Sequence, residues 1–522
     1  MNSLLPSHKT PSSITRRRAL QDAFAFTASV LLPGCGSPPS NGTPGGPANG
    51  NAQPTPTGAI TAASLNVSAN SAGTIGSAFA GLSYEKGSLI QNPYLFTGNN
   101  ANLIALFKLI GPSVLRVGGN SVDRNVWTPK GAGQTPGQIA PSDVDALAAF
   151  VKAAGWQCLY GINLGGAGPH PYTNGPIVAT TTTALAAQEI AYACQAFGSS
   201  LLGFEIGNEC DLYGKSYFSG TTWNISTFES LWTEFRDAIV AQTPSAAPLC
   251  TGPADASNES SWTIPFGQYA TTKEISLLTQ HYYRGNGMSP ASTAANLITP
   301  DTTLLSDLRT LEAGAKTIGV PYRLAECNSY YNGGASGVSD AYCSSLWIID
   351  FLFSCALNGA VGTNFHGGGN GSGYTPIADS GGAVIEARPE YYGILLFTLA
   401  GQGTLYTTSL SGIGGLNVTA YAVQTSSAGL NVIVVNKDST QNLHLTVQLP
   451  QTANSATLLE MTQLSSGASG PNLSATSGVT IQGTTVSPNG SFSPGQAYAL
   501  NPGGTQLTCY VPSLSAVLIQ VA

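Results

Sequence analysis

The sequence predicts an α/β protein, a (β/α)8 barrel with an additional antiparallel β-sandwich, on the basis of three observations. Short apolar strands alternate with amphipathic helices over residues 76–401, which indicates a parallel sheet. The strand candidates in this range number eight, as a closed barrel requires. From residue 402 onward the helical spacing gives way to alternating strands with Gly- and Ser-rich turns, which is typical of a sandwich.

The repeating unit of the barrel is a strand followed by a helix. Strands are expected at 76–84, 113–118, 157–164, 201–207, 248–253, 275–283, 321–326 and 360–366. Helices are expected at 101–110, 142–154, 183–197, 227–242, 303–317, 339–357 and 389–400. A doubly wound sheet is the alternative, but the Gly-rich stretch 161–168 lacks the GxGxxG order of a phosphate loop.

The first 58 residues contain targeting and linker signals. Thr15-Arg16-Arg17-Arg18 before an apolar stretch resembles a twin-arginine export signal, so residues 1–35 are expected to direct export. Leu32-Pro33-Gly34-Cys35 resembles a lipoprotein cleavage box, which makes Cys35 a candidate lipid-anchor site. Residues 36–58 read as a Gly/Pro/Ser-rich linker. The expected location is the periplasm or the cell surface of a bacterium.

The sandwich is expected to include a strand from before the barrel. Residues 63–68 alternate apolar and polar side chains, so 59–75 is expected to join the strands of 402–522. The segments 416–423, 430–436, 443–449 and 511–521 are the clearest of those later strands.

Composition limits the partners. The formal net charge of −7 does not favour nucleic acid or other polyanions. No segment after the signal has roughly 20 uninterrupted apolar residues, so no integral membrane segment is expected. The cysteines form no CxxC pair, and His281 and His366 stand alone on their strands, so no metal or other cofactor is predicted. A Cys210–Cys327 bridge is conceivable in an exported protein.

Two glutamates stand at the ends of predicted barrel strands. Glu209 follows the fourth strand and Glu326 ends the seventh. Barrel enzymes hold their chemistry at the C-terminal ends of the strands, and glycoside hydrolysis needs two carboxyl groups in one cleft. Glu205 has the same side-chain parity as Glu209 and is interpreted not as a catalyst but as a residue that supports the catalytic groups or as a member of a buried ion pair. Arg116 and Arg323 are expected inside the barrel, paired with Glu205 or with the catalytic carboxylates.

Four ordered motifs resemble glycoside hydrolase family 79, which holds β-glucuronidases and heparanases. They are Leu115–Asn120 (LRVGGN), Glu205–Glu209 (EIGNE), His281–Tyr283 (HYY) and Glu326–Gly334 (ECNSYYNGG). The similarity runs from about residue 60 to the C-terminus. The resemblance implies that Glu209 is the general acid/base and Glu326 the nucleophile, with Asn208 bound to the sugar 2-hydroxyl.

The resemblance also implies which residues bind the sugar. Tyr331, the backbone N–H groups of Asn332 and Gly333, and the Tyr374 hydroxyl would hold a glucuronic acid carboxylate. Tyr282 would donate to the nucleophile. Glu85 and Asn120 would contact the sugar hydroxyls.

The function expected from these residues is retaining exo-β-glucuronidase activity on a glucuronic-acid-containing glycan or glucuronide. A heparanase-like endo-β-glucuronidase is the first alternative. A non-catalytic carbohydrate-binding surface lipoprotein is the second.

Overall fold

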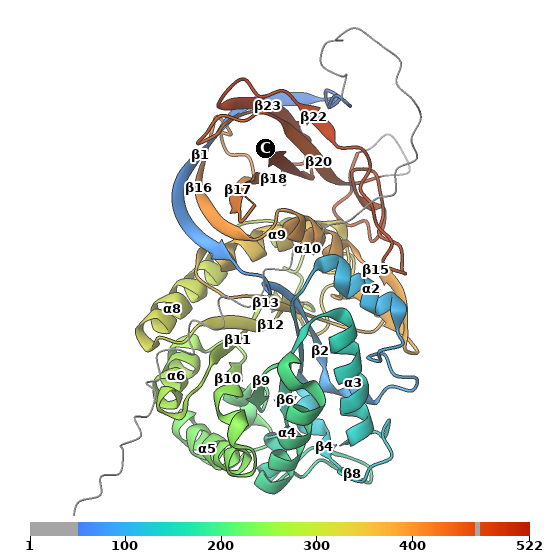
Figure 1. The fold of residues 1–522 in the computed structure, drawn as a ribbon, viewed down its shortest axis with the longest axis vertical. Helices are drawn as coiled ribbons and strands as arrows, with labels where there is room; N and C mark the ends of the chain where they lie inside the picture. Colours follow the sequence, from blue (N-terminus) through green and yellow to red (C-terminus); the bar gives the residue numbers. More distant parts are fainter. Residues whose placement is uncertain (1–50, 428, 465–469) are drawn as a thin grey trace, which may run out of the picture. The chain divides into compact units, whose positions relative to one another are not determined.

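The computed structural model describes residues 51–427, 429–464 and 470–522, and their core element is a closed barrel of eight parallel strands (Figure 1). The predicted export signal, with Cys35, and the first part of the predicted linker lie outside the described residues. The barrel closes in the order β10-β11-β12-β13-β2-β3-β6-β9. In chain order its strands are β2 (Ala80–Glu85), β3 (Val114–Gly118), β6 (Gln157–Ile162), β9 (Leu201–Ile206), β10 (Cys250–Asp255), β11 (Leu277–Asn286), β12 (Tyr322–Tyr331) and β13 (Thr363–Gly367).

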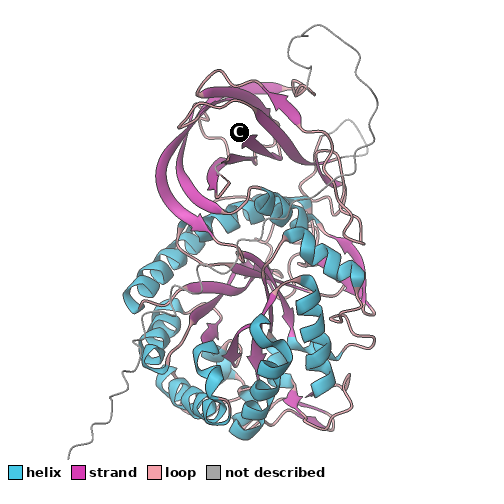
Figure 2. Ribbon diagram, viewed as in Figure 1, coloured by secondary structure: helices cyan, strands magenta, loops and turns pink. Residues whose placement is uncertain are grey.

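Helices surround the barrel strands, as Figure 2 shows. They are α2 (Ala101–Ile110), α3 (Pro141–Ala154), α4 (Thr183–Phe197), α5 (Ile225–Gln242), α6 (Ile264–Ala270), α7 (Ala294–Leu297), α8 (Thr302–Ile318), α9 (Tyr342–Leu357) and α10 (Pro389–Leu399). Several begin where the sequence supplies a side-chain acceptor for the first turn, such as Thr182 before α4 and Asp301 before α8. The predicted fold class is confirmed, but α6 between β10 and β11 was not expected.

The second part of the fold is a mostly antiparallel sheet of ten strands. Its strands are β1 (Ala59–Ile75), β16 (Gly403–Ser411), β17 (Val418–Thr425), β18 (Leu430–Asn436), β19 (Gln441–Gln448), β20 (Ala456–Gln463), β21 (Val479–Ile481), β22 (Tyr498–Leu500), β23 (Gln506–Val511) and β24 (Ser515–Val521). The long β1 pairs antiparallel with β16 and parallel with β19. The segment before the barrel is therefore a central strand of this sheet.

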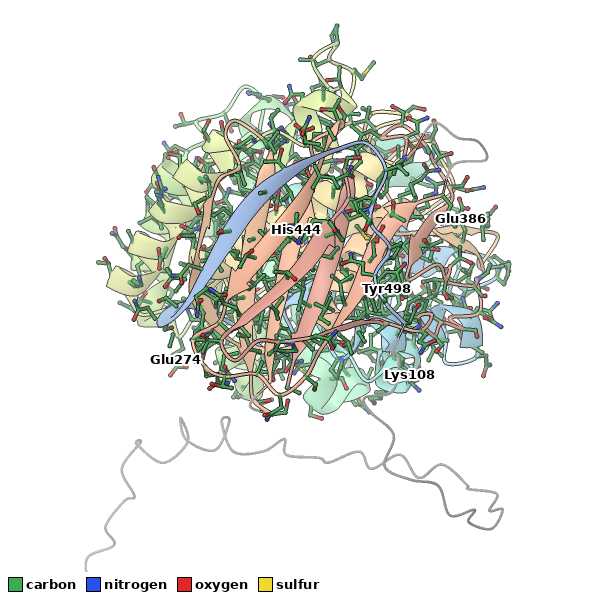
Figure 3. All side chains as sticks on the ribbon, turned by 90° about the horizontal axis from the view of Figure 1, so that it is seen from above. Lys108, Glu274, Glu386, His444 and Tyr498 are labelled. Atoms are coloured by element: carbon green, nitrogen blue, oxygen red, sulfur yellow. The ribbon has the colours of Figure 1, made fainter. Side chains whose placement is uncertain are left out.

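Both faces of the middle of this sheet are buried. In β18, Val432 and Val434 belong to the core inside the curled sheet, whereas Ile433 and Val435 belong to the core shared with the barrel helices. This explains why 432–435 is a continuous apolar run. Toward the edge, His444 of β19 lies exposed on the outer face (Figure 3).

Two barrel strands extend further than predicted, and this shapes the candidate site. The β11–β12 ladder continues to the pair Asn286–Tyr331, past the apolar residues on which the sequence prediction rested. At the other end, the first barrel strand begins at Ala80 rather than at residue 76, because β1 extends to Ile75.

The eight cysteines of the described part of the chain are all free. Cys210 and Cys327 form no bridge: the Cys210 thiol lies 3.7 Å from the Ile206 carbonyl, and that of Cys327 lies 3.4 Å from the Asn364 carbonyl. Within the same residues, no helix is both long and apolar enough to cross a bilayer.

Candidate active site

The barrel brings Glu209 and Glu326 together at the C-terminal ends of its strands. Glu209 follows β9, the fourth barrel strand, and Glu326 lies in β12, the seventh. One carboxylate oxygen of Glu209 and one of Glu326 lie within 4.8 Å of each other. The side chain of Glu326 is 8% exposed and that of Glu209 is 21% exposed. The two carboxyl groups therefore share one space but differ in their contact with solvent.

Arg116 of β3 joins three of the predicted polar residues beneath this space. Its fully buried guanidinium donates from Nε to Glu205 at 2.7 Å, from Nη1 to Glu326 at 2.5 Å and from Nη2 to the Asn208 amide oxygen at 2.8 Å. The expected ion pair between Arg116 and Glu205 is thus present. Because the guanidinium fork is rigid, it fixes the relative positions of Asn208 and Glu326.

The environment of Glu326 favours its ionised form. Burial alone would raise the pKa of this carboxyl group, but the positive charges of His366, His281 and Arg116 and the Tyr283 hydrogen bond hold the pKa well below its usual range. A carboxylate that stays ionised at all ordinary pH values is suited to act as a nucleophile or a charge stabiliser.

The tyrosine that contacts Glu326 is Tyr283, and the expectation for Tyr282 is wrong. The Tyr283 hydroxyl donates to Glu326 Oε1 at 2.8 Å, whereas the Tyr282 hydroxyl donates to Asp301 at 2.7 Å. Successive side chains of a strand point to opposite faces, so His281 and Tyr283 face the barrel interior and Tyr282 faces the helices. The sequence carries this information, because His281 and Tyr283 are two residues apart and therefore lie on the same face of a strand.

Two histidines that seemed isolated along the chain flank the glutamates. His281 Nδ1 lies 3.1 Å from Glu209 Oε1, and His366 Nδ1 lies 3.7 Å from Glu326 Oε2. For His281, burial lowers the pKa, but Glu326 and Glu209 outweigh burial and the Arg116 charge, so the pKa lies above its usual value. β11 and β13 lie on either side of β12, which places both rings beside Glu326.

Glu209, His281 and Glu326 are also the group of side chains that could offer three ligand atoms to a metal ion. Both oxygens of Glu326 already accept hydrogen bonds, from Arg116 and Tyr283, and His281 faces Glu209. The three groups are therefore engaged with protein partners in a way that suits proton transfer and charge stabilisation.

The residues expected to bind a sugar carboxylate lie at the rim beside Tyr283. The rings of Tyr331 and Tyr374 lie 6.5 and 5.8 Å from the Tyr283 ring. Asn332 and Gly333 follow β12 with φ angles of 63° and 83°, and the Gly333 carbonyl accepts the Tyr374 N–H at 3.2 Å. Among the described residues, the N–H groups of Asn332 and Gly333 have no acceptor. Donors without a partner among the described residues thus lie next to Tyr331 in the chain and beside Tyr374 in space.

Glu85 is the last residue of β2, and Asn120 follows β3. Glu85 accepts hydrogen bonds from the N–H groups of Ser121 at 2.7 Å and Asn120 at 3.3 Å. Its Oε1 lies 3.9 Å from His366 Nε2, and its side chain is 38% exposed. Glu85 therefore orders the loop after β3 and still has surface free for a ligand, and Asn120 is exposed at the same loop.

Arg323 does not reach the site, and the expected carboxylate partner is wrong. Its buried guanidinium donates to the Asn364 amide oxygen and to backbone carbonyls, including those of Ala78 and Thr363. Among the described residues no carboxylate pairs with it, and burial lowers its pKa to about 9. The reason is position: Ala78 and Thr363 lie where β2 and β13 begin, at the end of the barrel away from Glu326.

Proteins of known activity resemble this chain in sequence. A β-glucuronidase of Aspergillus niger is 25% identical over 391 residues, which cover 66% of this chain and 68% of that protein. A β-glucuronidase of Neurospora crassa is 25% identical over 388 residues (66% and 65%), and heparanase-like protein 3 of Arabidopsis thaliana is 24% identical over 384 residues (67% of each). The matches span 65–68% of the relatives' length. No family model matches the sequence.

Solved structures support the fold. A 4-O-α-L-rhamnosyl-β-D-glucuronidase of Fusarium oxysporum superposes with a TM-score of 0.69 at 19% identity, covering 87% of this chain and 99% of that one. A family 51 α-L-arabinofuranosidase of Thermotoga petrophila gives 0.61 at 15% identity, covering 88% and 100%. These structures show the fold. The sequence relatives confirm the resemblance that the motifs indicated: the chain is similar to the β-glucuronidases and heparanase-like proteins of glycoside hydrolase family 79.

Proposed function

We propose that this protein is a retaining exo-β-glucuronidase in which Glu326 is the nucleophile and Glu209 the general acid/base. The observation that carries the proposal is the approach of one oxygen of each carboxyl group to within 4.8 Å. Retaining glycosidases hold the two carboxyl groups about 5–5.5 Å apart, whereas inverting enzymes leave about 6.5–9.5 Å for a water molecule.

The roles of the two glutamates follow from their surroundings. Glu326 is held ionised by Arg116 and the two histidines, so it can attack the anomeric carbon. Among the described residues His281 is the cationic group that Glu209 contacts, and Glu209 is partly exposed, so it can exchange a proton with solvent. In the first step Glu209 protonates the leaving oxygen while Glu326 forms the glycosyl–enzyme bond. In the second step Glu209 takes a proton from the water that breaks this bond.

His281 suits both steps because it faces Glu209 and lies beside Glu326. When Glu209 is ionised, a protonated His281 Nδ1 can donate to it across 3.1 Å. When Glu209 is protonated, a neutral His281 can accept from it. The hydrogen bond therefore holds the acid/base in place in either state of protonation.

The rim beyond Tyr283 is proposed to select glucuronic acid. The free N–H groups of Asn332 and Gly333 and the hydroxyls of Tyr331 and Tyr374 are neutral donors that can hold a carboxylate. The left-handed backbone at Asn332 and Gly333 lets successive N–H groups converge, as in other anion-binding loops. The relatives named β-glucuronidase support this choice of sugar.

The heparanase-like alternative receives support from the Arabidopsis relative, which covers a similar part of the chain. An endo-acting enzyme on a sulfated polymer needs basic subsites along an open cleft. This chain has 19 Lys and Arg residues in 522 and a net charge of −7, which favours the exo-acting enzyme.

Hydrolysis of an aryl β-glucuronide tests the proposal, with the matching β-glucoside and β-xyloside as controls. The wild type is expected to cleave the glucuronide only, and Glu209→Gln and Glu326→Gln are expected to lose this activity. Binding of a glucuronide without turnover would instead favour the non-catalytic carbohydrate-binding protein. Cleavage of the glucoside at an equal rate would refute glucuronate selection.

A further inference from the structure

The turn that carries Glu209 has a backbone conformation that needs support from outside. Glu209 has φ 50° and ψ 48°, in the left-handed region that residues other than glycine rarely adopt, and Gly207 has φ 89°. Such a conformation persists when the surrounding structure determines it. The question is which groups hold residues 207–210 in place.

Several hydrogen bonds fix this turn, including one from the Gly207 N–H to the Ile162 carbonyl at 2.9 Å. The Glu209 N–H donates to the Ala254 carbonyl at 2.8 Å, and the Trp223 indole N–H donates to the Cys210 carbonyl at 2.7 Å. The Asn208 N–H donates to the Tyr213 hydroxyl at 3.1 Å. The last contact acts on the residue directly before the acid/base, and it can be removed by deleting a single hydroxyl group.

Tyr213 is itself anchored, so it can act as a fixed acceptor. Its buried hydroxyl donates to the Asp123 carboxylate, and Asp123 also accepts the N–H groups of Leu164 at 2.9 Å and Gly165 at 2.8 Å. Asp123 follows β3 and Leu164 follows β6. One carboxylate therefore joins the loops after three neighbouring barrel strands, β3, β6 and β9.

Side chains also pack tightly around the turn, in addition to the hydrogen bonds. A Cβ atom at Gly207 would lie 2.4 Å from the Cys210 sulfur and 2.9 Å from the Tyr213 hydroxyl oxygen. The Tyr213 ring stacks on Phe218 and Trp223, with centroids 6.2 and 5.7 Å away. The turn therefore has little room for a different path while Tyr213 stays in place.

We propose that Tyr213, held by Asp123, is a positioning residue that sets the placement of the general acid/base through the Asn208 N–H. This inference rests on the role proposed above for Glu209. Among the described residues, the Tyr213 hydroxyl bonds to Asp123 and to the Asn208 N–H and not to Glu326, so its effect is on the direction in which the Glu209 carboxyl group points.

The chemistry of the leaving group distinguishes this role from a merely structural one. A poor leaving group must be protonated by Glu209 as its bond breaks, whereas a good leaving group departs as an anion without help. A displaced acid/base should therefore slow the cleavage of poor substrates and leave activated ones almost unchanged. General loss of folded protein would slow both equally.

The test compares kcat/KM for two aryl β-glucuronides, with phenyl and 2,4-dinitrophenyl leaving groups, in wild type and Tyr213→Phe. The variant keeps the ring and removes only the hydroxyl. Because small misplacements of a catalytic group cost up to about 100-fold, we expect a loss of about 10- to 100-fold for the phenyl compound. The loss for the dinitrophenyl compound should be less than about 3-fold.

Two further variants complete the design. Tyr391→Phe is the matched control, since its buried hydroxyl donates to the Leu106 carbonyl at 2.7 Å, away from the candidate site. It should leave the ratio of the two rates unchanged. Trp223→Phe removes the hydrogen bond on the other side of the turn and should shift the ratio in the same direction as Tyr213→Phe. If Tyr213→Phe does not fold, the ratio of the two rates in Trp223→Phe tests the inference instead.

An unchanged ratio in a folded Tyr213→Phe variant would overturn the inference, as would an unchanged ratio in Trp223→Phe where only that variant folds. A crystal structure of the folded variant gives a readout that does not depend on the sugar. Displacement of residues 207–210 supports the positioning role, and an unmoved turn refutes it. If the wild type cleaves neither glucuronide, the proposed function fails, and this structural comparison still decides the role of Tyr213.

Discussion

Replacing Arg116 with Gln should move the pH dependence of catalysis in a direction that the site geometry fixes. Arg116 is fully buried and donates to two carboxylates, Glu205 and Glu326. Removing one partner of a buried ion pair costs about 3–5 kcal/mol. If this free energy is shared equally between Glu205 and Glu326, the ionised form of Glu326 loses about 1.5–2.5 kcal/mol of stabilisation. At 1.36 kcal/mol per unit, the pKa of Glu326 should rise by about one to two.

The sign follows from the direction of the wild-type pKa. The pKa of Glu326 is depressed in the folded protein, so its ionisation stabilises the fold above the unfolded value and the stability is lost as the pH falls through the folded value. In Arg116→Gln the folded pKa is higher. The acid limb of kcat/KM should therefore move upward by about one to two pH units. The stability that the variant loses relative to wild type should be nearly the same at pH 4 and at pH 7, because both values lie above the folded pKa of Glu326 in either protein, and should shrink only at lower pH.

The assay is a kcat/KM profile from pH 2 to 8 on an aryl β-glucuronide, with thermal unfolding over the same range, because the shifted acid limb lies at the low end of this range. Arg323→Gln is the matched control, because Arg323 is an equally buried arginine with no carboxylate partner among the described residues. It should lower stability without moving the acid limb. An acid limb that stays in place in a folded Arg116→Gln variant would refute the reasoning.

Three further predictions use neighbouring groups. Tyr283→Phe removes the hydroxyl that contacts Glu326 and should lower kcat about 10-fold or more, whereas Tyr282→Phe should change kcat by less than about 3-fold; steady-state kinetics of the pair checks this. Tyr374→Phe should reduce the ratio of glucuronide to glucoside hydrolysis, mainly through KM, and an unchanged ratio would exclude the hydroxyl from carboxylate binding. Glu390 is fully buried, and burial raises its pKa to about 8, so folding costs free energy increasingly as the pH rises from about 4.5 to 8. Glu390→Gln should therefore raise Tm at pH 8 more than at pH 5, and an equal effect at both would contradict the burial argument.

The sequence was sufficient for the fold because the barrel and the sheet bury their elements in different patterns. The helix 101–110 and the helix 183–197 begin and end where predicted, since apolar spacing, caps and a following glycine agree. The polar ends of β11 and β12 were not predicted, because Asn328 and Ser329 are satisfied by tertiary partners that local spacing does not show.

Site residues could be predicted where their role depends on a single strand. They were harder to predict where their role depends on which strands are neighbours in the barrel. Glu209 follows a strand and Glu326 ends the apolar part of one, so each could be placed on its own. The positions of His281 and His366 beside the two glutamates become apparent only once β11, β12 and β13 are known to be neighbours. Tyr283 could have been chosen over Tyr282 by strand alternation alone.

Covalent trapping tests the proposed double displacement most directly. A 2-deoxy-2-fluoro-β-glucuronyl fluoride should react once with the wild-type protein, because the fluorine slows the second step more than the loss of fluoride. Peptide mass spectrometry should then find one glucuronyl group, on Glu326. A label on Glu209, or a protein that cleaves aryl glucuronides with inversion and is never labelled, would contradict the assignment of Glu326 as the nucleophile.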